Sequence, residues 1–392
     1  MDRNYKLIEV TNKKLVREFL KMPVDLYKED KNWIRPLDED IEKIFDPKKN
    51  KYFRKGDAIR WILYNEQDKS IGRIAVFYTK GKKGKSDQAI SGIGFFDCIN
   101  EQYAANIMFN AAKDWLGNNG MDAMDGPINF GSRETFWGCL YDGFYEPNYN
   151  MPYNFKYYND LFKNYGFKNY FNQFTFHIEL LTGIMDPVIY ERGKKLRKNN
   201  KYAFKNIELK NINKYSEDFV TIFNEAWSNF PGVKPMRKEQ AFKMFSKMKL
   251  ILDPKIMIFA YYEERPIGFY LMIPDLYQVT KHFNGKFHLM NKFKLFFNLR
   301  IRKVATKVIG LIFGVVPDFH NKGVADGMIL HFEDTVAKPG FRYTDLEMNW
   351  IGDFNPTMIK LVEYIGGKVH KTHITYRYLF DRNKEFKRAK SI

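Results

Sequence analysis

The chain has 392 residues, and its 64 Lys and Arg against 46 Asp and Glu give a formal net charge of +18. With 45% hydrophobic and 17% aromatic residues it has enough apolar side chains for two cores, which excludes a disordered protein. Two cysteines, Cys98 and Cys139, exclude a disulfide framework, and the seven histidines show no zinc-binding spacing with them, so we expect no metal.

The N-terminal residues lack the apolar core of a signal peptide, and no segment approaches the ~20 apolar residues of a membrane span. We therefore expect a cytoplasmic protein. Further along, residues 71–77 predict a strand. The middle of the first half is rich in glycine and aromatic residues, and such loops either line a ligand pocket or cover a core. The aromatic residues are Tyr141, Phe144, Tyr145, Tyr149, Tyr153, Tyr157 and Tyr158.

Two pairs of similar segments indicate that the chain contains two copies of one unit. Residues 161–168 (LFKNYGFK) precede residues 361–368 (LVEYIGGK) by 200 positions, and Ile71-Gly72 precedes Ile267-Gly268 by 196. A basic, mostly polar stretch separates the copies and suits a linker or an exposed helix end. We therefore divide the chain into residues 1–185, a basic linker over 186–203, and residues 204–392.

The segment from Lys281 to Lys307 combines basic and apolar residues. Lysines and arginines alternate there with Phe287, Phe293, Phe296, Phe297 and Leu299. Four interpretations stay open: a helix with a core face and a solvated face, a site for a ligand phosphate, a surface for an anionic membrane, and a contact for RNA.

An uncharged strand is predicted over residues 308–316, and the loop V-P-D-F-H-N-K-G-V-A follows it into a helix with apolar residues at positions 324, 328, 332 and 336. A loop that ends at a helix start offers unpaired N–H groups and the positive end of the helix dipole. Gly323 lets the backbone approach a ligand, and Ala325 keeps the next turn slim. The pattern is typical of a pyrophosphate cradle.

A strand is next predicted over residues 343–350, and a helix with recognisable ends follows. Asn355 is a good N-cap, Pro356 suits the first helical position, and the pair Gly366-Gly367 provides a left-handed stop. A last strand is predicted over residues 372–380. His370 and His373 form the closest histidine pair, but residues three apart on a strand point to opposite faces, which argues against a metal site.

From the 315–325 loop to the last strand, these elements resemble the GNAT superfamily of acyl-CoA-dependent N-acyltransferases. The family's loop has V-x-P, Arg or Gln, two residues, Gly, one residue, and Gly or Ala. Gly323 and Ala325 match, whereas His320 replaces the Arg or Gln. The resemblance implies an α/β (α+β) fold with two GNAT-like domains, each a mixed, mostly antiparallel sheet flanked by helices.

The resemblance also implies a cofactor site in the second copy. The N–H groups of Val315 and Val316 would bind pantetheine and polarise the thioester carbonyl, Asn355 would reach the cofactor, and the pyrophosphate would lie on His320, Asn321, Lys322, Gly323, Val324 and Ala325. In the first copy the equivalent residues 95–104 contain no glycine, and Asp97 and Glu101 would repel a pyrophosphate. We therefore expect acyl-CoA binding in the second copy and support or substrate recognition in the first.

Glu347 lies where some family members place a general base, and a half-buried carboxylate there would have a raised pKa. The alternative is a surface glutamate, because Asp345 shares its face of the strand. Val362 replaces the tyrosine that serves as general acid in much of the family. Either a phenol from another segment serves, or the thiolate leaves unprotonated.

The function predicted from these features is acyl transfer from acyl-CoA, acetyl-CoA or a longer one, to a primary amine in a ternary complex. Two alternatives stay open. Fem-like transferases, which take an aminoacyl group from tRNA, share the tandem arrangement but do not need the loop at residues 315–325. A non-catalytic acyl-CoA-binding or sensor protein would account for the missing tyrosine.

Overall fold

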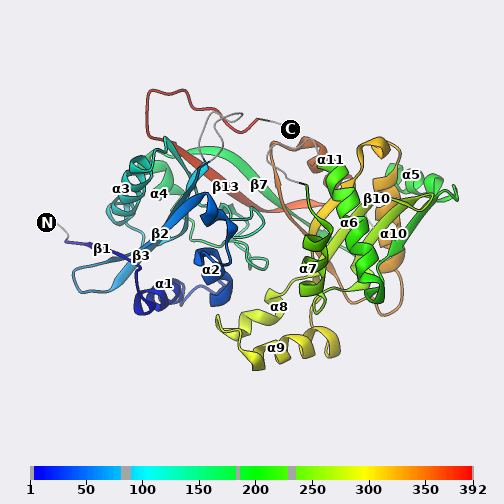
Figure 1. Cartoon of the computed structure of the whole chain (residues 1–392), viewed down its shortest axis with the longest axis horizontal. Helices are drawn as coiled ribbons and strands as arrows, with labels where there is room; N and C mark the ends of the chain where they lie inside the picture. The colour runs from blue at the N-terminus through cyan, green and yellow to red at the C-terminus, as the bar shows by residue number, and fades with distance from the viewer. Residues whose placement is uncertain (1–3, 81–89, 182–185, 228–234, 391–392) are drawn as a thin grey trace.

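The computed structural model describes residues 4–80, 90–181, 186–227 and 235–390 (Figure 1). The boundary predicted at residue 185 lies outside these ranges. Eleven α-helices are described: α1 Lys13–Leu26, α2 Asp38–Phe45, α3 Gln102–Asn118, α4 Tyr158–Tyr165, α5 Pro187–Arg197, α6 Ile212–Ala226, α7 Lys238–Met248, α8 Tyr277–Thr280, α9 Leu289–Phe296, α10 Val324–Val336 and α11 Pro356–Tyr364.

All thirteen described strands belong to one mixed sheet. They are β1 Lys6–Glu9, β2 Gly56–Tyr64, β3 Ser70–Thr79, β4 Ile90–Cys98, β5 Ala123–Gly126, β6 Cys139–Asp142, β7 Lys168–Glu179, β8 Tyr202–Asn206, β9 Met257–Tyr262, β10 Arg265–Pro274, β11 Lys307–Val315, β12 Asp345–Gly352 and β13 Lys368–Leu379. The order is β1-β2-β3-β4-β5-β13-β7-β12-β11-β10-β9-β8, and β6 pairs with β13. Most pairs are antiparallel, as the sequence predicts, and β4-β5 and β11-β12 are parallel.

The repeated segments occupy equivalent places in the two halves. Ile71-Gly72 lies in β3 and Ile267-Gly268 lies in β10, while residues 161–168 and 361–368 each run from a helix into a final strand. The final strands are exchanged, however. β13 pairs with β5 of the first half, β7 pairs with β12 of the second half, and β7 and β13 pair with each other. Figure 1 shows these two strands crossing between the halves.

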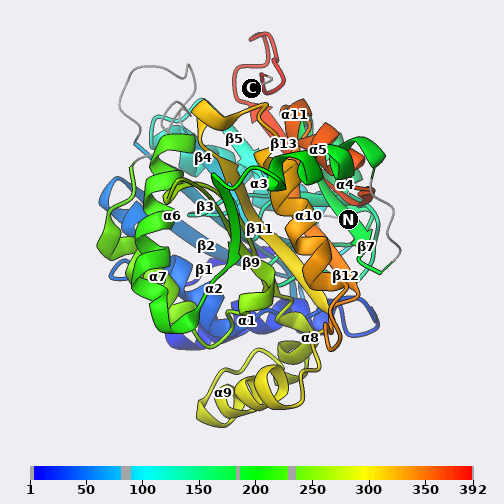
Figure 2. The same cartoon turned by 90° about the vertical axis from the view of Figure 1, so that its right-hand side faces the viewer.

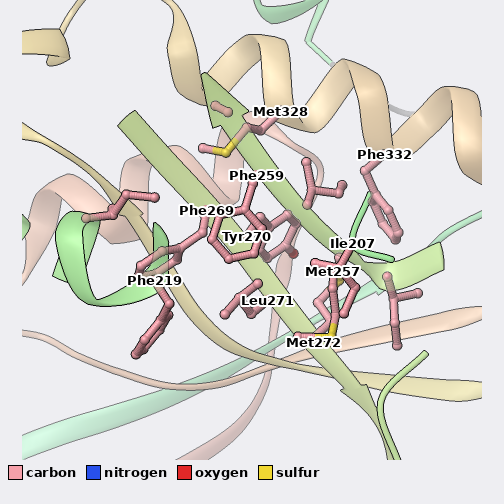
Figure 3. Close-up of a cluster of buried hydrophobic side chains, with 14 of the residues drawn as sticks. Ile207, Phe219, Met257, Phe259, Phe269, Tyr270, Leu271, Met272, Met328 and Phe332 are labelled. Carbon is pink, nitrogen blue, oxygen red and sulfur yellow. The ribbon is translucent and has the colours of Figure 1, made fainter. Parts of the chain in front are cut away.

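Helices cover both faces of the sheet in the second half. α6 and α7 lie on one face and α10 lies on the other (Figure 2). The core between sheet and helices is strongly aromatic: Phe259 and Phe269 are fully buried, and Tyr270 packs against Phe332 of α10 with 6.0 Å between ring centroids (Figure 3). This packing fixes α10, and therefore its N-terminus, over the end of β11.

The stretch predicted as a basic linker is largely helical. α5 packs so tightly on α10 that a Cβ on Gly193 would lie 2.8 Å from the carbonyl oxygen of Asp326. Arg197 also forms an ion pair with Asp334 of α10, with 2.6 Å between nitrogen and oxygen. The division of the chain into two domains remains a prediction, because each half contributes its final strand to the sheet of the other.

The exchange of the final strands creates an ion pair between β13 and β5 of the first half. Arg377 of β13 binds both carboxylate oxygens of Asp125 of β5, at 2.6 and 2.7 Å, and both side chains are largely buried. We predict that Arg377→Met lowers the free energy of unfolding by about 3 kcal/mol, because it leaves a buried carboxylate without its cation.

Denaturant unfolding measures this loss. Arg388→Met is the matched control, since it removes the arginine of the more exposed pair with Asp353. Equal losses in the two variants would contradict a special role for the Arg377 pair.

Candidate functional site

The parallel strands β11 and β12 separate along their length. Their pairing begins at Lys307 and Asp345 and stops at Gly310 and Met348, although β11 continues to Val315 and β12 to Gly352. Beyond Gly310, β11 therefore has a β-sheet partner only on the β10 side among the described residues. An opening of this kind exposes backbone groups in the middle of a sheet, where a ligand can pair with them.

The loop between β11 and α10 is held in a conformation that favours glycine. Asn321 and Gly323 have φ angles of +60° and +79°, and Gly323 is the residue that precedes the first turn of α10. The imidazole Nε2 of His320 lies 2.9 Å from the carbonyl oxygen of Val315, so this side chain folds back onto the end of β11. The N-terminal N–H groups of α10 and the exposed Lys322 together suit an anion.

The basic helix α5 adds positive charge beside this loop. A Cβ on Gly323 would lie within about 4 Å of the carbonyl oxygen of Arg192 and of the Leu196 side chain. Arg192 acts electrostatically on Asp326, a buried carboxyl in the first turn of α10 whose pKa burial raises. The linker stretch is thus part of the surroundings of the predicted phosphate loop.

Only one of the two predicted carbonyl contacts is geometrically available. The N–H of Val316 donates to the carbonyl oxygen of Ile267 at 2.9 Å, so it cannot also bind a thioester. Neighbouring residues of an antiparallel strand direct their N–H groups to opposite sides. The N–H of Val315 therefore points away from β10 and toward the opening beside β12.

A cavity of about 170 Å³ lies between α10, the end of α11 and the sheet. Ile329 and Phe332 of α10 and Leu346 of β12 give it a largely apolar wall. Tyr270 also belongs to this wall, and its hydroxyl is buried with no hydrogen-bond partner among the described residues. Tyr270 of β10 is therefore a candidate for the phenol from another segment, whereas Val362 of α11 is buried in the core.

Glu347 lies on the other face of β12, within a buried cluster of charges. One carboxylate oxygen lies 2.6 Å from Lys371 Nζ and accepts a hydrogen bond from Asn148 at 2.8 Å, and the other lies 3.2 Å from Lys307 Nζ. Lys307 also pairs with Asp275 at 3.0 Å. Glu347 is only 3% exposed, so the alternative of a surface glutamate is wrong.

The predicted raised pKa of Glu347 is also wrong. Burial by itself would raise the pKa, but Lys371 and Lys307 outweigh burial and lower the pKa of Glu347 to about 2. The carboxylate is therefore ionised at neutral pH and is a weak base. Its two lysines could not be foreseen, because β11 and β13 bring them from positions 40 residues before and 24 residues after it.

Two histidines lie beside this cluster. His370 is half-buried, its Nε2 is 3.8 Å from Glu347, and its ring stacks on Tyr145 with 4.2 Å between centroids. Burial and the nearby Lys371 lower the pKa of His370 to about 4, so the imidazole is neutral at pH 7. His177 pairs with Asp345 at 2.8 Å. His373, in contrast, is buried and makes a contact with the carbonyl oxygen of Pro152.

The first half provides the cover of the Glu347 cluster. Asn148 binds Glu347, Tyr145 stacks on His370, and the N–H of Tyr149 donates to Asp275 at 3.2 Å. The aromatic loop of the first half therefore contains both buried residues and residues that border this site. The composition of this loop gives no sign of the strand that it covers.

In the first half, the equivalent of the phosphate loop is too short for a cradle. Only residues 99–101 lie between β4 and α3, whereas residues 316–323 lie between β11 and α10. Asp97 is buried and pairs with the buried Arg73 at 2.7 Å, so the guanidinium compensates its charge. Chain length, rather than repulsion by Asp97, distinguishes the two loops.

The remaining predicted residues have structural contacts of their own. The side chain of Asn355 accepts a hydrogen bond from the N–H of Met358 at 3.2 Å, which confirms the predicted N-cap. Val324 is buried and Ala325 is half-buried at the start of α10. Lys322 lies over the ring of Phe319, with 4.8 Å from Nζ to the centroid. The assignment of these residues to a cofactor remains a prediction.

No protein-family model matches the chain. A GCN5-related glucosamine N-acetyltransferase region in a fungal multi-domain GH3 beta-N-acetylglucosaminidase superposes with a TM-score of 0.56 at 12% identity, over 96% of this chain and 38% of that one. A tandem GNAT protein from the clavulanic acid biosynthesis pathway superposes with a TM-score of 0.54 at 7% identity, over 97% of this chain and 100% of that one. The chain has a tandem GNAT fold.

Two curated proteins are similar to this tandem GNAT chain along most of its length. A bacterial ceramide synthase of Caulobacter vibrioides is 23% identical over 369 residues, which cover 92% of this chain and 94% of the synthase. Protein YghO of Escherichia coli is 23% identical over 377 residues, which cover 93% of each chain.

The buried charge cluster gives stability a defined pH dependence. We predict that Glu347→Gln lowers the free energy of unfolding at pH 7 by about 3 kcal/mol, because two buried lysines lose their shared carboxylate. Since the folded pKa lies below the ordinary 4.5, this contribution is complete above pH 4.5 and is lost as the pH falls toward about 2.

Denaturant unfolding at several pH values checks both parts. Glu263→Gln serves as the control, because its carboxylate belongs to an exposed pair with Lys201. A Glu347 variant with wild-type stability at pH 7 would show that the cluster does not stabilise the fold.

Proposed function

We propose that the chain transfers an acyl group from acyl-CoA to a primary amine, with the cofactor between β11 and β12 of the second half. The observation that carries this proposal is the opening between these strands, which ends at the loop with Gly323 in a left-handed conformation. In this arrangement the loop and α10 hold the pyrophosphate, and the N–H of Val315 faces the pantetheine and the thioester carbonyl.

The largely apolar cavity between α10 and the sheet suits the acyl chain. Its wall includes Ile329, Phe332 and Leu346, and it lies on the α10 face of the sheet. Glu347 and His370 belong to the opposite side of β12, where the loop of the first half covers them. Acyl donor and amine would thus approach the same strand from different faces of the sheet and could meet in a ternary complex.

In the proposed reaction the neutral amine attacks the thioester carbonyl carbon. A C–N bond forms, the C–S bond breaks, the amine gives up a proton, and CoA leaves as the thiolate, which takes up a proton. We assign the amine proton to His370, because this imidazole is neutral at pH 7 and more exposed than Glu347. The ionised Glu347, 3.8 Å away, then stabilises the imidazolium.

The similarity to the ceramide synthase of Caulobacter favours a lipid amine as the acceptor. A ceramide is the amide of a fatty acid with a long-chain amino alcohol, so the synthase from Caulobacter is named for N-acylation of such an amine. We extend this to the present chain as the proposed substrate class, a long-chain primary amine. The similarity to the solved GNAT structures supports an acyltransferase without indicating the acceptor.

The non-catalytic alternative has one observation in its favour. Val362 is buried in the core, and the position of the family tyrosine therefore offers no proton to the thiolate. A sensor would bind acyl-CoA and release no thiol. The Fem-like alternative requires no phosphate loop, and it is less well supported because the loop at residues 316–323 is long and its glycine is left-handed.

Binding of the cofactor tests the site directly. We predict that acetyl-CoA and longer acyl-CoAs bind the wild-type chain, and that Gly323→Glu weakens binding at least about tenfold, because a carboxylate would face the phosphates. Gly340→Glu is a matched control, since Gly340 has a φ of +76° and open space around its Cα.

Calorimetric titration measures both variants. Equal weakening by the two substitutions would assign the effect to backbone strain, and the loop would then not be the phosphate site. Tighter binding of long-chain than of acetyl-CoA would support the cavity as the site of the acyl chain.

A second test concerns the base. We predict that His370→Gln lowers kcat/KM for thiol release with a long-chain amine at least about 100-fold, while acyl-CoA binding is retained. His331→Gln is the control, because this imidazole contacts Asn206 of β8 and lies outside the Glu347 cluster and the arm. Wild-type rates in the His370 variant would exclude this imidazole as the base.

A further inference from the structure

The segment that precedes β11 projects from the body of the molecule as a helical arm. We use this term for residues 281–303, which include α9 and the π-helical turn Phe297–Ile301 that extends it. In both views of the fold, α9 lies at the edge of the molecule and beyond the remaining helices (Figures 1 and 2). Within the described residues, no helix is both long and apolar enough to cross a membrane.

The outer face of the arm is strongly apolar. Phe293 is 63% exposed, and the positions of Leu289, Met290 and Phe296 relative to it place all four side chains on one side of α9. Three of the four phenylalanines that are exposed among the described residues belong to the arm. Its exposed large hydrophobic residues are Leu289, Met290, Phe293, Phe296, Phe297 and Ile301.

The inner face attaches the arm firmly to the body. Leu295 and Leu299 are buried in a small core with Leu276 and Phe283 from the start of the segment and Leu37 of the first half. The guanidinium of Arg300 donates to the backbone carbonyl oxygens of Lys249 and Leu250. The apolar outer face is therefore held outward by a packed inner face, and it is not the result of a missing core.

The charges of the arm have only one sign. Residues 276–317 contain no Asp or Glu, and the arm itself carries Lys281, Lys286, Lys292, Lys294, Arg300, Arg302 and Lys303. On α9, Lys292 and Lys294 flank the apolar stripe on its two sides, as their positions next to Phe293 require. The lysines at the two ends of the basic segment 281–307 form ion pairs with the body of the protein: Lys281 binds Glu146, and Lys307 binds Glu347.

We propose that the arm docks the protein on an anionic lipid bilayer. The apolar stripe enters the boundary between headgroups and acyl chains, while the flanking lysines and arginines bind lipid phosphates. A basic helix with a wide apolar face is the arrangement that this boundary favours. The proposal does not depend on the acyltransfer reaction, because it rests on the arm alone.

Two other partners fit the arm less well. A second copy of the chain would bring another arm with no acidic residue, so the cations of the two arms would repel each other. RNA would satisfy the cations and could stack on the phenylalanines, but Leu289, Met290 and Ile301 offer nothing to a nucleic acid. The exposed aliphatic side chains therefore favour lipid.

Docking through the arm would bring the proposed acceptor side close to the bilayer. Asp275, which binds Lys307 in the Glu347 cluster, lies two residues before α8, and the arm begins directly after α8. Lys281 binds Glu146, close in sequence to Asn148 of the same cluster. A long-chain amine in the membrane would thus lie on the side of the sheet that carries His370.

Flotation with vesicles tests the proposal on the full chain without acyl-CoA or amine, so its result is independent of activity. The vesicles contain either phosphatidylcholine alone or equal parts of phosphatidylcholine and phosphatidylglycerol. We expect the wild type to float with the anionic vesicles, and added salt to weaken binding. We expect Leu289→Ser with Phe293→Ser to weaken it at least about tenfold.

Lys292→Glu with Lys294→Glu should have a similar effect on binding to anionic vesicles. Tyr103→Ser is the control, because it removes an exposed aromatic side chain from α3, which lies on a different part of the molecule in Figure 1. Thermal unfolding confirms that each variant is folded.

Several outcomes would overturn the proposal. One is that the wild type does not float with the anionic vesicles. Another is that Tyr103→Ser weakens binding as much as the double serine variant does. A third is that light scattering shows a dimer of the wild type that the double serine variant no longer forms. Binding of single-stranded RNA that depends on the two lysines and is unchanged by the two serines would indicate a nucleic-acid surface instead.

Discussion

The pairing of β7 with β13 is the constraint on which the rest of the structure depends. Each of these strands is the last element of its half. One edge of each strand pairs with the sheet of the other half, and the opposite edges of the two strands pair with each other. The continuous sheet that results fixes the distance between the predicted phosphate loop of the second half and the covering loop of the first half. Neither half could form the candidate site by itself.

The charged cluster around Glu347 lies at this junction and shows what the exchange makes possible. Lys371 comes from β13, Lys307 from β11, and Asn148 from the first half. A buried carboxylate between two lysines is costly to assemble, so its presence at the junction points to a functional use. It provides a fixed negative charge that favours protonation of the neighbouring imidazole, against the burial and the Lys371 charge that lower the pKa of His370 to about 4.

The parts of the fold that could be predicted are those that depend on residues close in sequence. The strand over residues 308–316, the helix from Val324, the Asn355 cap and the left-handed Gly366 all follow from local patterns, and the offsets of 200 and 196 residues indicated the repeat. The exchange of the final strands could not be predicted. A final strand that stays with its own half and one that joins the other half bury the same alternating residues. The same reason explains the wrong expectations for Glu347: alternation identifies its face but not the side chains that lie opposite.

The exchanged strands also have a consequence for synthesis of the protein on the ribosome. β5 cannot receive its neighbour until β13 has emerged, and Asp125 and its partner Arg377 are 252 residues apart. A first half that has already been translated therefore waits with an open sheet edge next to β5 while the whole second half is made. Such an edge can pair with strands of other chains. During that interval the nascent chain therefore needs protection by chaperones, more than a protein whose domains fold one after the other.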